Sequence, residues 1–319
     1  MDILFTCIGI LAVLAVLFFT ATFICFYIAF YAPREKKQPD EEDYSIPPGE
    51  IYEPHREQMV AWMKEARSIP HERFEITSYD GLKLSGCYYE YAPGAPIEIM
   101  FHGYRGSAER DLCGGVQRCF SLGRSALVVD QRSSGRSEGR VITFGIRERY
   151  DCLSWVDFAI EHFGGSVQLL LCGISMGAAT VMMAAGMELP DNVKGVIADC
   201  GYTSPREIIC KVIRQIGLPA KLMYPFVKLG AKIYGRFDLE EASALESMKN
   251  CRIPVFFAHG EPDDFVPCEM SRVNYEACAA PKKLLTVPGA GHGLSYIIAP
   301  QEYLDCAAEV WAMRPDREC

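Results

Sequence analysis

The stretch Gly173-Ile174-Ser175-Met176-Gly177 has the residue types and spacing that could present a nucleophile. An apolar run at 167–171 precedes it and small helix-forming residues follow, which predicts a strand, a tight turn and a helix. Such a turn strains the serine backbone and exposes its hydroxyl at the end of a sheet. Free N–H groups at the start of the helix favour developing negative charge. An ordinary strand–helix turn with a capping serine has the same local pattern, so other residues must decide.

A serine hydroxyl is a poor nucleophile at neutral pH unless a base takes its proton and a third group orients the base. The chain has six histidines. His292 lies in a glycine-rich loop, 288–293, after the last expected strand, where flexible neighbours let an imidazole reach Ser175. The other five precede the sheet, end a helix or follow strands in His-Gly pairs that brace loops: His55, His71, His102, His162 and His259. We therefore predict that His292 is the base.

The acid that orients this base should lie in the loop after the preceding strand, at residues 259–267. Asp263 and Asp264 are adjacent there, and two adjacent carboxylates cannot both face one histidine. The other one is solvated or caps the next turn. Spacing alone leaves the choice between Asp263 and Asp264 open.

A tetrahedral oxyanion needs backbone N–H donors. Met176, directly after Ser175, is the first expected donor. The second is expected from Tyr104, in the loop that follows the strand at 97–101 and reads HGYRGS. The glycines allow this loop to fold toward the serine. A plain strand–helix turn is the alternative.

Five ordered motifs resemble those of the α/β-hydrolase superfamily, over residues 73–319. The similarity is greatest to serine aminopeptidase-like and bacterial membrane-anchored hydrolases. The motifs here are FHG at 101–103, DQRSSGRS at 130–137, GISMG at 173–177, HGEPDDFVP at 259–267 and GAGH at 289–292. The resemblance implies that Asp263, three residues before Val266, is the acid. It also implies that Asp130, Arg132, Gly135 and Ser137 brace the loop beside the site, and we assign Asp199 a similar structural role.

The order of elements predicts an α/β fold. A hairpin around Tyr79-Asp80-Gly81 opens it, and alternating strands and helices then give a mostly parallel sheet with helices on both faces. Strands are expected at 73–78, 82–90, 97–101, 126–129, 167–171, 193–198, 254–258 and 283–287; helices are expected around 59–66, 108–120, 147–162, 176–186, 269–279 and 301–312. The long stretch at about 202–250 breaks this rhythm with helical apolar spacing. We interpret it as a helical cap over Ser175, within a catalytic domain at 55–319.

Residues 3–31 are almost uniformly apolar and carry no charge. About 20 such residues cross a bilayer core. We expect a retained transmembrane anchor at 1–32 rather than a cleaved signal peptide, because the run is too long and no basic residues precede it. Residues 33–54 are predicted to be a polar, proline-rich linker. Arg34, Lys36 and Lys37 follow the span, which favours a cytoplasmic domain, although the opposite topology stays open.

Composition narrows the function further. The net charge of −9 argues against a nucleic-acid partner. The 14 cysteines show no metal-ligand spacing, so we expect free thiols and neither metal nor cofactor, with Cys172 buried and inert. We predict a membrane-anchored serine hydrolase that cleaves carboxylic esters or thioesters with an apolar acyl group. The alternatives are an aminopeptidase using the same residues and a non-catalytic binding protein on the same fold, because one fold hosts many functions.

Overall fold

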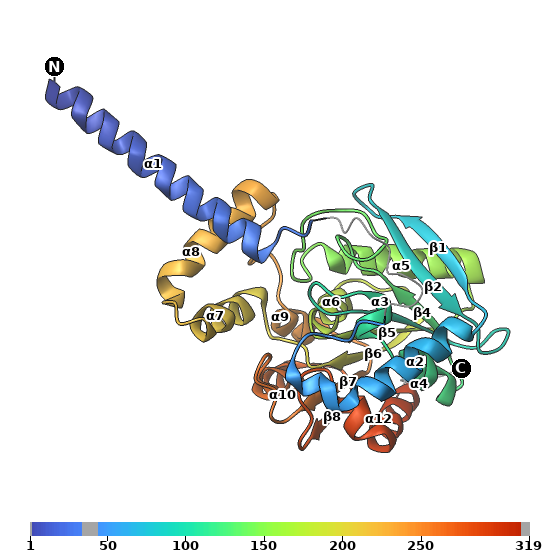
Figure 1. Cartoon of the computed structure of the whole chain (residues 1–319). Helices are drawn as coiled ribbons and strands as arrows, with labels where there is room; N and C mark the ends of the chain where they lie inside the picture. Colours follow the sequence, from blue (N-terminus) through green and yellow to red (C-terminus); the bar gives the residue numbers. More distant parts are fainter. Residues whose placement is uncertain (1, 34–43, 314–319) are drawn as a thin grey trace.

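The computed structural model describes residues 2–33 and 44–313 (Figure 1). An eight-stranded sheet forms its centre, in the order β1-β2-β4-β3-β5-β6-β7-β8. The first two strands form the expected antiparallel hairpin, β2 also pairs antiparallel with β4, and the remaining pairs are parallel. The strands are β1 (Glu72–Thr77), β2 (Lys83–Tyr89), β3 (Ile97–Phe101), β4 (Ser125–Val129), β5 (Leu169–Ile174), β6 (Val193–Asp199), β7 (Val255–Gly260) and β8 (Lys282–Val287).

Alternating side chains of the parallel strands divide between two apolar cores. In β3, Ile97 and Ile99 belong to the core shared with α5 (Glu148–Phe163) and α6 (Met176–Ala185), whereas Met100 belongs to the core shared with α4 (Gly115–Ser121) and α12 (Pro300–Ala312). Strands buried on both faces need helices on both faces. The α/β class, the mostly parallel sheet and its two helical layers are therefore confirmed. The shorter helices α9 (Ala244–Asn250), α10 (Cys268–Ala277) and α11 (Ser295–Ile298) complete the layers.

Two local predictions differ from the structure. The helix expected around 108–120 is two helices, α3 (Ala108–Asp111) and α4, because Gly114 adopts a left-handed conformation with φ 82° between them. Residues 44–54, expected in the linker, instead pack on the domain through the buried side chains of Ile46 and Tyr52. These residues lead through η1 (Glu50–His55) into α2 (Arg56–Ser68). Arg34, Lys36 and Lys37, on which the expected topology rests, lie outside the described residues.

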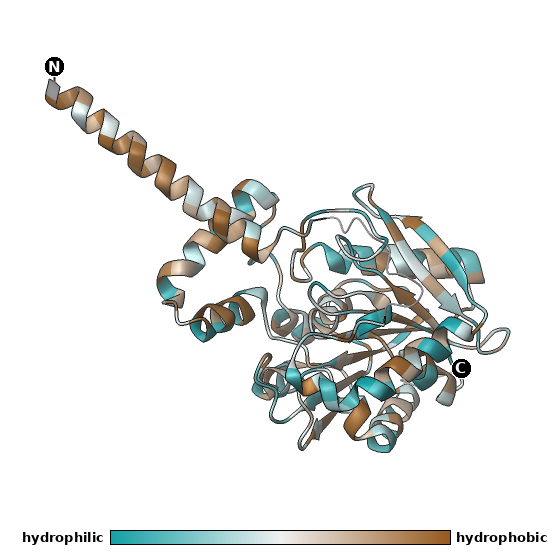
Figure 2. Ribbon diagram, in the orientation of Figure 1, coloured by the Kyte–Doolittle hydropathy of each residue, from teal (hydrophilic) through white to brown (hydrophobic). Residues whose placement is uncertain are grey.

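The N-terminal helix α1 (Asp2–Ala29) projects from the body of the molecule, and its last turns contact the segment between β6 and β7 (Figure 1). That segment contains α7 (Pro205–Gln215), α8 (Ala220–Gly230) and the π-helical turn η2 (Ala231–Gly235). Figure 2 shows that α1 is apolar along its exposed length. The buried side chains of Phe26 and Phe30 form one apolar cluster with residues of α7, α8 and the start of α6.

A buried ion cluster fixes β3 to the helices on one side. The Glu98 carboxylate is fully buried and pairs with the guanidinium groups of Arg118 and Arg124, the second at 3.1 Å. Arg124 also donates to the Ala307 carbonyl of α12 at 3.0 Å. Burial alone would raise the pKa of Glu98, but the two guanidinium groups outweigh it and hold that pKa below its usual value.

Glu98→Gln should therefore destabilise the fold strongly. The substitution leaves two buried guanidinium groups without a counter-charge, which typically costs about 3–5 kcal/mol of the free energy of unfolding. The measurement is chemical denaturation of the full chain in detergent. Glu75→Gln, at an exposed carboxylate on β1 that lies 3.7 Å from Lys83, is the matched control and should change stability little. Equal effects of the two substitutions would contradict the role given to the cluster.

Candidate active site

The carboxyl ends of the parallel strands bring the predicted site residues to one edge of the sheet. Ser175 follows β5, Tyr104 follows β3, Asp263 follows β7 and His292 follows β8. Strands β3 and β5 are direct neighbours, with Phe101 paired to Gly173, so the loops after them are adjacent. Ligands of open α/β sheets bind at this edge.

Ser175 lies in a strained turn between β5 and α6. Its backbone has φ 56° and ψ −115°, a region that non-glycine residues rarely adopt, and its N–H donates to the Asp199 carbonyl at 2.8 Å. The turn is tight because two residues lack a Cβ. A Cβ at Gly173 would collide with the backbone of Gly177, and one at Gly177 would collide with the backbone at the end of β3.

Three side chains form a hydrogen-bonded line at this turn. The Ser175 Oγ lies 2.9 Å from Nε2 of His292, and Nδ1 of His292 lies 2.6 Å from Oδ2 of Asp263. An imidazole that carries its proton on Nδ1 donates to Asp263 and can accept the hydroxyl proton of Ser175. Ser175 and Asp263 are buried, whereas His292 is partly exposed. The geometry is that of a nucleophile, a base and an orienting acid.

The Asp263 carboxylate is fixed by four hydrogen bonds. Its Oδ1 accepts from the N–H groups of Phe265 and Val266, each at 2.9 Å, and Oδ2 faces both His292 and, at 3.1 Å, Nε2 of His259. Burial alone would raise the pKa of Asp263, but the hydrogen bonds from the two imidazoles outweigh it and hold the pKa well below its usual value. Stability that Asp263 contributes as an anion is lost as the pH falls toward that lowered pKa.

The neighbouring Asp264 points elsewhere. It is exposed, and its carbonyl oxygen accepts from Lys211 and, at 2.9 Å, from Gln215, both on α7. Of the two carboxylates that the sequence left open, the structure brings Asp263 to His292. His259, which we expected to brace a loop, is a second imidazole on the same carboxylate, and its Nδ1 lies 2.7 Å from the Ser271 hydroxyl.

Met176 and the loop that carries Tyr104 lie beside Ser175. Met176 begins α6, so its N–H is among the groups that lack a partner inside the helix. A Cβ built on Gly103, next to Tyr104, would lie 3.6 Å from the Cβ of Ser175. The Tyr104 hydroxyl donates to the Ala29 carbonyl of α1 at 2.8 Å. The N-terminal helix thus holds the loop that carries the second expected donor, a contact that no local sequence pattern indicates.

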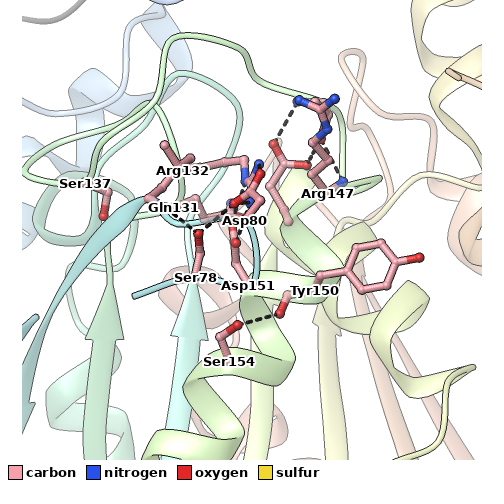
Figure 3. Close-up of polar contacts among 12 residues, drawn as sticks. Ser78, Asp80, Gln131, Arg132, Ser137, Arg147, Tyr150, Asp151 and Ser154 are labelled. Carbon is pink, nitrogen blue, oxygen red and sulfur yellow. Dashed lines mark hydrogen bonds and ion pairs between the residues drawn. The ribbon is translucent and has the colours of Figure 1, made fainter. Parts of the chain in front are cut away.

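The DQRSSGRS motif braces the loops behind the site. Arg132 makes two hydrogen bonds of 2.6 Å to Asp151 and also pairs with Asp80 of the β1–β2 hairpin, an arrangement visible in Figure 3. Asp130 accepts from the N–H of Ala108 at 3.0 Å, at the start of α3. Burial raises the pKa of Asp151 to about 6 despite Arg132. These contacts agree with the structural role that the resemblance implied.

Two residues near the site escaped the sequence analysis. The Tyr52 hydroxyl donates to the His292 carbonyl at 3.0 Å, and burial raises the pKa of that hydroxyl. Cys200 is buried with its Sγ 3.9 Å from Nε2 of His292, and burial raises the pKa of the thiol. Tyr52 lies in the stretch interpreted as linker and Cys200 in a strand-like run, so neither carried a local signal.

One group of potential metal ligands lies at the site among the described residues. Cys200, Asp263 and His292 offer ligand atoms that lie within 4.8 Å of one another. The hydrogen bond between Asp263 and His292 already occupies Nδ1, and a metal on Nε2 would displace the Ser175 hydroxyl. The site as folded suits proton transfer better than metal binding. Cys172 is buried against Arg118, and burial raises its pKa, as expected for an unreactive thiol.

Comparisons with known proteins give the fold. No protein-family model matches the chain. YqkD of Bacillus subtilis, described as uncharacterised, is 28% identical over 176 residues, which are 55% of this chain and 58% of YqkD. The chain thus aligns with little more than half the length of that relative.

Solved structures cover more of the chain. The Pyrococcus furiosus esterase Pf2001 superposes with a TM-score of 0.65 at 21% identity, over 85% of this chain and 97% of the esterase. The Pyrococcus horikoshii acylaminoacyl peptidase superposes with a TM-score of 0.57 at 17% identity, over 80% of this chain and 44% of the peptidase. The chain has the α/β-hydrolase fold, as the resemblance implied.

The close approach of Gly177 to the backbone at the end of β3 leads to a prediction about stability. Gly177→Ala forces a Cβ into the backbone at the end of β3, which should lower the free energy of unfolding by at least about 2 kcal/mol. Gly165→Ala is the matched control, because a Cβ there meets nothing within 4 Å. Thermal unfolding of the two full-length variants in detergent tests this. A Gly177→Ala variant as stable as the control would show that the turn is looser than described.

Proposed function

We propose that the chain is a membrane-anchored serine hydrolase that cleaves carboxylic ester or thioester bonds through Ser175, His292 and Asp263. The hydrogen-bonded line from the Ser175 hydroxyl through His292 to Asp263 carries this proposal. The strained serine turn supports it, because strain of that kind persists only where the surrounding structure holds it. The named esterase and peptidase of the same fold support a hydrolase as the broader class.

In the proposed reaction the Ser175 oxygen attacks the acyl carbon while His292 takes the hydroxyl proton. Asp263 stabilises the imidazolium and fixes its orientation. The N–H groups of Met176 and Tyr104 would hold the oxyanion, and losing one such donor typically costs about 3 kcal/mol of barrier. The leaving alcohol or thiol takes the proton from His292. Water, deprotonated by the same imidazole, then releases the acid from Ser175.

An apolar acyl group is the substrate feature that we propose. The side chain of Met176 belongs to an apolar cluster that includes Phe144, Tyr202 and Ile208, so apolar groups surround the start of α6. A peptidase using the same residues is the second candidate, because one superposed structure is an acylaminoacyl peptidase. A binding protein without activity is the third, and the intact hydrogen-bonded line argues against it.

We further propose that α1 is a retained anchor. It contains an apolar stretch of 27 residues, Ile3–Ala29, which is long enough to cross a bilayer. Apolar length alone does not distinguish such a helix from a signal sequence near the N-terminus. However, Phe30 is fully buried and Phe26 nearly so, and the Ile142 N–H donates to the Phe30 carbonyl at 2.8 Å. Cleavage after this segment would expose apolar core. We place the domain on the cytoplasmic side, following the basic residues after the span.

Ser175→Ala tests the proposal directly. The full-length protein should react with a fluorophosphonate probe and turn over a p-nitrophenyl ester from a series of acyl lengths, whereas the variant should do neither. Thioesters and aminoacyl amides belong in the same panel. Undiminished ester turnover by Ser175→Ala would refute the proposal. Amide cleavage without ester cleavage would favour the peptidase, and absence of probe labelling in the parent protein would favour the binding protein.

The adjacent carboxylates provide a matched pair. Asp263→Asn keeps the side-chain shape but removes the charge that orients and stabilises protonated His292, so kcat should fall by about 10³-fold or more with a small change in KM. Asp264→Asn changes an exposed side chain and should keep kcat within about 2-fold. Ester kinetics of the two variants check this. Equal losses, or a larger loss in Asp264→Asn, would reverse the assignment of the acid.

A further inference from the structure

The segment from Arg214 to Arg236 has an unusual charge for this chain. It contains five basic residues and no acidic residue, in a protein of net charge −9. Arg214 lies on α7, Lys221 and Lys228 lie on α8, Lys232 lies in η2, and Arg236 follows η2. Lys228 pairs with Glu240, whereas Lys221 and Lys232 are exposed. A positive surface of this kind attracts anionic groups.

The same segment exposes large apolar side chains. Ile216 is 65% exposed, Leu218 42% and Leu222 61%, in and around the turn between α7 and α8, and Ile233 of η2 is 41% exposed. Apolar residues exposed singly are ordinary, but several in one short segment that also carries exposed basic residues indicate an interaction surface. We call these four side chains with Lys221 and Lys232 the cap-tip surface.

Contacts with α1 fix where α8 and η2, which carry most of the cap-tip surface, lie along that helix. The Phe226 ring of α8 lies 5.4 Å from the Phe18 ring, and the Tyr234 hydroxyl of η2 donates to the Phe19 carbonyl at 3.1 Å. Gly230 passes so close to Thr22 that a Cβ would lie 2.7 Å from the Thr22 carbonyl oxygen. Figure 1 shows α8 alongside the domain-proximal part of α1.

The length of α1 then sets the depth of α8. About 20 residues are needed to cross the hydrocarbon core, and the apolar stretch begins at Ile3. The domain-side end of the span therefore lies near Thr22 or closer to the domain, wherever the span is placed. Phe18 is within the hydrocarbon in each case, so its partner Phe226 on α8 reaches the membrane boundary.

We propose that the cap-tip surface is a second membrane contact, seated in the headgroup region of the bilayer that α1 crosses. This inference rests on the anchoring in the proposed function. The apolar side chains enter the boundary between headgroups and acyl chains, while Lys221 and Lys232 face anionic lipid. An apolar hollow of about 380 Å³ between α1 and Tyr234, lined by Val16, Phe19 and Phe23, suits an acyl chain. Lys211 and Gln215, just before the cap-tip surface in the chain, donate to the Asp264 carbonyl, so the segment between β6 and β7 also contacts the loop that carries Asp263.

A lipid surface fits these observations better than a protein partner. The helix α8, which carries Leu222, packs against α1, so lipid already surrounds its neighbour once the span is inserted. A protein partner would have to displace that lipid. The exposed Lys221 and Lys232 match anionic headgroups.

The experiment measures depth with a tryptophan on the cap-tip surface. Full-length Leu222→Trp is reconstituted into vesicles of phosphatidylcholine with roughly a third phosphatidylglycerol. Lipids brominated near the headgroup should quench about half or more of the fluorescence that the new indole adds. Tyr91→Trp is the control, because Tyr91 is 50% exposed in the loop before β3, at the opposite edge of the sheet from Ser175. Its added fluorescence should not be quenched.

Flotation of the same vesicles separates the two proposals. Protein that floats and resists alkaline extraction while Leu222→Trp is quenched no more than Tyr91→Trp would overturn the cap-tip contact and leave the anchor intact. Protein that fails to float would overturn the anchor. Quenching is also compared between vesicles with and without phosphatidylglycerol. Phosphatidylglycerol should increase the quenching of Leu222→Trp, but not when Lys221→Gln and Lys232→Gln are added to the same protein. A dependence as strong as before would remove the proposed lysine contacts with anionic lipid.

Discussion

A buried, ionised carboxylate organises the candidate site. Asp263 can remain charged away from water because two backbone N–H groups and two imidazoles donate to it. Each donor comes from an element whose position is otherwise determined: the turn at 263–266, the end of β7 at His259 and the loop after β8 at His292. Satisfying one carboxylate therefore holds three segments in register and aims Nε2 of His292 at Ser175.

The strands and the serine turn could be predicted from the sequence because they depend on residues that are close together in the chain. Strands β3 and β5 are short, mostly apolar runs, IEIMF and LLLCGI, and they end where the site loops begin. The serine turn can be predicted from its sequence because close backbone contacts require glycine at positions 173 and 177. Tyr52 shows where prediction from local pattern stops. Its side chain contacts a carbonyl 240 residues away, and nothing in a proline-rich polar stretch indicates that pairing.

The end of α1 shows the same limit for a larger element. Carbonyls in the last turn of a helix need partners from outside it. Here the Tyr104 hydroxyl donates to Ala29, and Arg105 donates to Ile28 and Tyr31 at 2.8 and 3.0 Å. The sequence of α1 indicates only an anchor, but the last turn of this helix packs against the domain. Its final carbonyls are satisfied by the loop that would supply an oxyanion donor, so helix and loop hold each other in position.

This mutual support bears on the strain at Ser175. A non-glycine residue at φ 56° persists only where its surroundings leave no alternative. On one side the turn is held by the missing Cβ atoms of Gly173 and Gly177 and by the bond to Asp199. On the other side lies the loop at Gly103, which α1 fixes through Tyr104. Removing α1 would therefore loosen one wall of the serine turn as well as remove the proposed membrane anchor, which ties the geometry of the site to α1.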